Sequence, residues 1–101
     1  MSLTIVVTCD VQSRYHGFLA SSMLEIAPGT YVSPRLNRDA RDRIWEVIND
    51  WFQALSRGSI TMIWRDKSCP GDVAIKHLGT ARRELKEIDG LLLTYRLSRT
   101  K

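Results

Sequence analysis

The side chains best placed for chemistry lie where the first apolar run of the sequence ends. Residues 3–8 form a β-rich run, and Cys9 and Asp10 follow it directly. A carboxylate at the carboxyl end of a strand projects from the sheet edge, where it can hold Mg²⁺ against a phosphate. The same side chain can instead cap the following turn. Asp10 is therefore the candidate catalytic and metal-binding residue, although two-metal chemistry would need a second copy across a two-fold axis.

Other residues that serve metal sites or nucleophilic catalysis are scattered. His16 and His77 have no ligand partner at metal spacing, so structural roles are expected for both. Cys9 has no basic neighbour to activate its thiol, which favours a small buried side chain. Cys9 and Cys69 lack CxxC spacing, and the chain lacks P-loop, GxGxxG, GxSxG and HExxH motifs. These absences argue against a zinc site, a nucleotide-dependent enzyme and a protease.

Arginine dominates the positive charge of the chain. Fifteen Lys and Arg residues stand against eleven Asp and Glu residues, which gives a net charge of +4, and eleven of the fifteen are arginine. A guanidinium binds phosphate through a planar fork of donors. Nucleic-acid binding and an ordinary solvated surface are both consistent with this excess.

The arginines considered for contact with nucleic acid fall into three groups: Arg14, the pair Arg38 and Arg41, and the pair Arg82 and Arg83. Arg38 is spaced i,i+4 from Asp42, and Asp39 from Arg43, which predicts surface ion pairs. Arg82 and Arg83 have only one acidic neighbour in the sequence, Glu84, so their charge is more available for contact with phosphate. Trp45, Trp51 and Trp64 are expected in the core or at an interface, with base stacking as the alternative.

Hydrophobic periodicity predicts the elements that position these residues. Helices are expected from Ser13, as the N-cap, to about Ile26, and from Asn37 to a C-cap at Gly58. Strands are expected over residues 3–8, 30–32, 59–64, 73–78 and 91–97, and residues 79–90 form at most one helical turn. The order β-α-β-α-β-β-β predicts an α+β ferredoxin-like sandwich, with two helices on one face of a mainly antiparallel sheet and an extra C-terminal strand.

A length of 101 residues is that of one domain, expected over residues 1–97 with a short basic tail at 98–101. The longest uncharged run has ten residues, against the ~20 that a membrane helix needs, so a cytoplasmic protein without a membrane segment is expected. Nothing in the chain covers the second face of the sheet. This predicts a homodimer packed sheet to sheet, with the last strand pairing with the partner protomer.

An ordered set of motifs resembles the CRISPR-associated Cas-two family, in the form found in type I-E systems. The matching segments are residues 6–11 with Arg14, then 17–20, 24–32, 41–48, 62–64, 79–83 and 89–91. The segment 41–48, RDRIWEVI, is the most distinctive. The resemblance covers residues 3–97, nearly the whole chain.

This resemblance implies a ferredoxin-like homodimer that bridges two dimers of the Cas-one integrase. The complex would capture double-stranded prespacer DNA for insertion into the CRISPR array, with this protein as the scaffold. Arg14, Arg82 and Arg83 match positions that touch the prespacer backbone, and Arg41 matches a further basic position. His16 stands where a relative carries arginine, so it is included among the nucleic-acid-binding residues.

Two other functions remain open. One is a Mg²⁺-dependent endonuclease acting on RNA or DNA through Asp10 residues paired across the dimer. In type I-E relatives the acidic residue that ends the first strand often stands one position earlier, where this chain has Cys9. The other function is that of an unrelated ferredoxin-like dimer that binds RNA or acts in regulation. A co-encoded integrase beside a repeat array would separate this last hypothesis from the scaffold.

Overall fold

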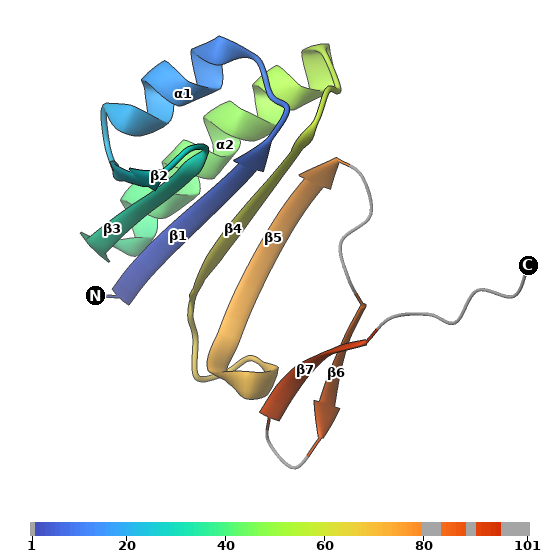
Figure 1. The fold of residues 1–101 in the computed structure, drawn as a ribbon. Helices are drawn as coiled ribbons and strands as arrows, with labels where there is room; N and C mark the ends of the chain where they lie inside the picture. The colour runs from blue at the N-terminus through green and yellow to red at the C-terminus, as the bar shows by residue number, and fades with distance from the viewer. Residues whose placement is uncertain (1, 80–83, 89–90, 96–101) are drawn as a thin grey trace, which may run out of the picture.

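The computed structural model describes residues 2–79, 84–88 and 91–95 (Figure 1). In chain order the elements are β1 (Ser2–Cys9), α1 (Ser13–Ala20), β2 (Leu24–Ala27), β3 (Thr30–Leu36), α2 (Arg38–Ala54), β4 (Ser59–Arg65), the 3₁₀ turn η1 (Pro70–Asp72), β5 (Val73–Gly79), β6 (Glu84–Ile88) and β7 (Leu91–Tyr95).

Five strands form one antiparallel sheet in the order β2-β3-β1-β4-β5. Figure 1 shows α1 and α2 together on one face of this sheet. The succession β1-α1-β2-β3-α2-β4 is that of the ferredoxin-like fold, to which β5 adds an edge strand. The predicted α+β sandwich is therefore confirmed.

Alternation along β1 separates the two faces of the sheet. Thr4, Val6 and Thr8 are buried beneath the helices, whereas Leu3 and Val7 on the other face are 48% and 39% exposed. Since successive strand residues point to opposite faces, one face of the sheet lies in the core and the other is open. The expected uncovered sheet face is present in the single chain.

Helix α2 forms because a cap and an apolar stripe agree. The Asn37 side chain accepts a hydrogen bond from the Ala40 backbone N–H at 2.8 Å, which satisfies a donor of the first turn. Ile44, Ile48 and Phe52 then recur every four residues and are buried against the sheet. Leu55 lies beyond this stripe, because the helix ends at Ala54.

The expected first helix is too long at its carboxyl end. Helix α1 stops at Ala20, and the following segment forms the edge strand β2, paired with β3. Met23 remains buried and its N–H still bonds to the Leu19 carbonyl, but Ile26 is exposed on β2. The spacing of Met23 and Ile26 suits a helix, whereas pairing with β3 satisfies the backbone of the edge strand instead.

Two expected caps are also wrong. The N-cap of α1 is Gln12 rather than Ser13, and its side chain makes no capping hydrogen bond. The C-cap of α2 is Leu55, in an extended conformation, so Gly58 lies three residues beyond it. Gly58 nevertheless has φ +79°, a conformation that suits glycine.

The carboxyl-terminal part adds a strand that the sequence did not indicate. β6 lies within the stretch expected to hold at most one helical turn, and it pairs antiparallel with β7 in a separate two-stranded sheet. The expected last strand is present as β7, and its pairing with a partner protomer stays a prediction. The expected tail at 98–101 lies outside the described residues. Across the described part of the chain, neither helix has the length and apolar character needed to cross a membrane.

Candidate nucleic-acid interface

Arg14 is exposed on the first turn of α1 and is held by an aromatic cluster. Its guanidinium carbon lies 3.9 Å from the centre of the Trp51 ring, an arrangement that a cation–π attraction stabilises. The Trp51 ring in turn packs edge-on against Tyr15 and Phe18, at centroid distances of 5.4 and 5.3 Å. Among the described residues Arg14 forms no ion pair, so its charge is available to an anion from outside.

His16 lies two residues after Arg14 on α1, and a contact with β3 orients its side chain. Its Nδ1 lies 2.7 Å from the hydroxyl of Tyr31, which is fully buried on β3. Burial raises the pKa of Tyr31, and the charge and hydrogen bond of the Glu25 carboxylate raise it further. The hydroxyl and the imidazole Nδ1 share one hydrogen bond, in which the tautomer of His16 sets the donor. The network orients the imidazole and occupies one of its two nitrogens.

Arg41 lies far from Arg14. It occupies the first turn of α2, with its guanidinium carbon 4.2 Å from the centre of the Trp64 ring. Ten residues of α-helix, about 15 Å of rise, separate it from Trp51, on which Arg14 rests. The structure therefore places these two predicted contacts at opposite ends of α2, each stacked on a tryptophan.

The three tryptophans confirm the expectation of a core role. Trp45, Trp51 and Trp64 are half-buried and pack against the hydrophobic core. The faces of Trp51 and Trp64 are covered by arginine side chains.

The two ion pairs expected on α2 do not form. Within the described part of the chain, the ion pairs join Arg41 to Asp42 at 4.0 Å and Arg57 to Asp10 at 3.2 Å. Arg38 and Arg43 have no carboxylate of the described residues within this range. Exposed pairs gain little free energy from contact, so i,i+4 spacing on a solvated helix face does not ensure one.

Asp10 follows β1 as expected, with the positive φ of 56° that Asp tolerates in a turn. Its side chain is 70% exposed, and its Oδ1 lies 3.2 Å from an Arg57 guanidinium nitrogen. The alternative role as a cap of the following turn is not realised, since α1 has no side-chain capping bond. Arg57 is 47 residues away in sequence, which is why no local pattern indicated it.

The surroundings of Asp10 do not fit Mg²⁺. The ion needs several oxygen ligands in octahedral geometry, but one Asp10 oxygen faces a guanidinium. In the parts of the chain described here, no three His, Cys, Asp or Glu side chains come together as a metal site. The neighbouring Cys9 is exposed, so its expected burial is wrong.

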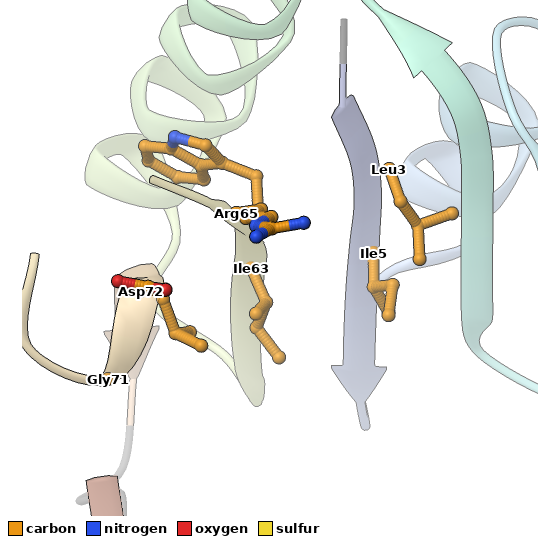
Figure 2. Close-up of a pocket in the computed structure, with 8 residues that line it drawn as sticks. Leu3, Ile5, Ile63, Arg65, Gly71 and Asp72 are labelled. Carbon is orange, nitrogen blue, oxygen red and sulfur yellow. The ribbon is translucent and has the colours of Figure 1, made fainter. Parts of the chain in front are cut away.

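The open sheet face carries an apolar hollow of about 640 Å³. Figure 2 shows Ile5 of β1 and Ile63 of β4 lining it from neighbouring strands, with Arg65 at the end of β4. Ile5 and Ile63 are register partners, so they lie side by side on the same face. Leu3 and Val73 extend the apolar lining.

Arg82 and Arg83, the other predicted phosphate contacts, lie outside the described residues. The structure therefore gives the geometry of three predicted contacts, Arg14, His16 and Arg41.

A family model described as CRISPR-associated protein (Cas_Cas2CT1978) matches residues 3–93. The chain belongs to this family. As a Cas-two family member it has a role in CRISPR adaptation, and the match runs from β1 into β7. Its assignment to type I-E systems stays a prediction.

Proposed function

We propose that this Cas-two protein is the DNA-binding scaffold of CRISPR adaptation, a homodimer that bridges two Cas-one integrase dimers. The family match over residues 3–93 carries the proposal. In this role the protein holds prespacer duplex by its backbone while the integrase performs strand transfer.

The exposed cations support backbone contact. Arg14 is presented rigidly on Trp51 with no competing carboxylate in ion-pair range among the described residues. Guanidinium bonds to phosphate oxygens are charge-assisted and carry no base information, which suits the capture of arbitrary sequences. Arg82 and Arg83 are assigned to the same task, with His16 and Arg41 as further contacts.

The open sheet face supports the dimer. Its centre is made of aliphatic side chains, and an exposed apolar face of this kind is typical of an interaction surface. Two copies packed face to face would remove it from water and would double the array of cations. The resulting two-fold symmetry also provides one docking surface for each of two integrase dimers.

The pairing of Asp10 with Arg57 supports a scaffold over a nuclease. A catalytic carboxylate that binds Mg²⁺ must present free oxygens to the ion, whereas Asp10 is turned to a guanidinium of its own chain. The endonuclease alternative would need Arg57 displaced and further ligands recruited from elsewhere.

Replacing Arg14→Gln should weaken binding of the Cas-one–Cas-two complex to duplex DNA by about tenfold at low salt. The loss should be equal for all sequences, because no base contact is removed. The slope of log affinity against log salt should fall by about one. Fluorescence anisotropy over a salt titration measures both quantities.

Arg43→Gln is the matched control. It removes the same charge from a hollow where three carboxylates outnumber the two cations, Arg43 and Lys76, which makes this hollow less favourable for phosphate. An Arg14→Gln complex that matches this control at every salt concentration would refute the DNA-contact assignment.

Asp10→Asn should leave spacer acquisition in cells nearly unchanged at wild-type protein levels. The change keeps the shape of the side chain, and the exposed ion pair that it weakens contributes at most about 1 kcal/mol. Arg57→Gln is the control, since it breaks the same pair and keeps the carboxylate. Loss of acquisition in Asp10→Asn alone, with the integrase complex assembled, would show that the carboxylate acts in the chemistry.

A further inference from the structure

A cluster of cations gathers at the end of the molecule opposite Arg14. Four basic side chains line a hollow of about 590 Å³ and come from three elements. Arg38 and Arg41 stand on the first turn of α2, Arg65 ends β4, and Lys76 lies on the edge strand β5. Only the assembled sheet and helix bring them together, since Arg38 and Lys76 are far apart in the chain.

Carboxylates do not balance this cluster. Asp42 and Asp66 are the acidic residues lining the hollow. Asp66 is engaged by its own loop, where it accepts bonds from the Ser68 N–H at 3.0 Å and the Ser68 hydroxyl at 2.7 Å. Asp42 lies 4.0 Å from the Arg41 Nε, too far for a hydrogen bond. In the described part of the chain, Arg38, Arg65 and Lys76 have no carboxylate within ion-pair range.

The positive end of a helix adds to this imbalance. Arg38 and Arg41 occupy the first turn of α2, where the helix dipole disfavours cations and favours anions. The Arg41 side chain is only 12% exposed, and its buried Nε has no hydrogen-bond partner among the described residues. A bound anion would offset the repulsion among these groups.

Trp64 holds the cluster in place. Its ring lies beneath Arg41, with the Lys76 ammonium nitrogen 5.9 Å from the ring centre. The aromatic surface restrains both side chains without neutralising either charge. Arg41 and Lys76 are therefore preorganised around this ring, and the exposed Arg38 and Arg65 flank them.

We infer that Arg38, Arg65 and Lys76 complete, around Arg41, a second site for a backbone phosphate of nucleic acid. This inference rests on the proposed function and enlarges the protein surface that is assigned to DNA contact. The cluster and Arg14 are separated by about 15 Å along α2, which equals the axial rise of about four nucleotides of one DNA strand. One duplex can therefore reach both sites.

The test uses the Cas-one–Cas-two complex and a fluorescently labelled duplex of arbitrary sequence. Arg38→Gln and Arg65→Gln each remove one cation of the cluster, and Arg43→Gln removes the same charge from the neighbouring acidic surface. Each cluster variant should weaken binding by about three- to tenfold at low salt and lower the salt slope by about one. Arg43→Gln should change neither. Circular dichroism and light scattering confirm that every variant keeps its fold and its oligomeric state.

The possible results separate this inference from the proposed function. If both cluster variants match Arg43→Gln while Arg14→Gln weakens binding, the second site is refuted and the scaffold stands. If the wild-type complex does not bind duplex DNA at low salt, the proposed function itself fails. If the cluster variants keep DNA affinity but lose the integrase, the hollow receives an acidic protein surface and the phosphate assignment is wrong.

Discussion

In the proposed homodimer, Ile5→Arg should shift the equilibrium from dimer to monomer. Ile5 lies near the centre of the open sheet face, directly beside its register partner Ile63. In a dimer packed sheet to sheet, a new guanidinium in each protomer would be buried among the aliphatic side chains of the hollow, beside the existing charge of Arg65. Burying an unpaired charge costs several kcal/mol, and the two-fold axis imposes that cost twice.

The expected effect is a dissociation constant raised by at least about a hundredfold, or nearly 3 kcal/mol. Light scattering and sedimentation over a concentration series measure it, and the melting temperature shows whether each chain still folds. Leu55→Arg is the matched control, since it adds the same charge at an exposed apolar residue just after α2. An Ile5→Arg protein that stays dimeric would place the interface elsewhere, and a monomeric wild type would refute the dimer itself.

Gly58→Ala should destabilise the fold by about 3 kcal/mol or more. Gly58 has φ +79°, which already disfavours a side chain, and an added Cβ would overlap the backbone carbonyls of Cys9 and Asp10. These carbonyls belong to the end of β1 and to the turn that follows it. Neither can withdraw without disturbing the pairing of β1 with β4 or the position of Asp10.

Urea unfolding followed by circular dichroism gives the change in free energy of unfolding. Gly17→Ala is the control, because a Cβ there meets no atom within 4 Å and the residue lies inside α1. That variant should be stabilised by about 0.5–1 kcal/mol, since alanine favours a helix. If Gly58→Ala unfolds at the same urea concentration as the wild type, the close approach at this turn does not contribute to the free energy of unfolding.

The cations show which parts of the candidate site could be predicted from the sequence. Arg14 and Arg41 could be nominated from residue type and family motifs, but their placement on Trp51 and Trp64 could not. Arg65 and Lys76 gave no local signal, because one ends a strand and the other lies within the next. Such residues meet only when the strands pair.

The sequence by itself determined the class of fold, the amphipathic second helix and the open sheet face. Each depends on periodicity within one segment, where spacing along the chain dictates which side chains share a face. The family motifs have the same local character, and the match over residues 3–93 confirmed the Cas-two family.

Only the tertiary structure decided the rest. β2 replaced the end of a predicted helix because β3 offered it backbone partners, and Asp10 was paired with Arg57, 47 residues away. The basic hollow around Trp64 joins α2 to β4 and β5. The physical reason is common to all three. Strand pairing, ion pairs and charge clusters are contacts between distant segments, and their geometry is set by how the elements pack.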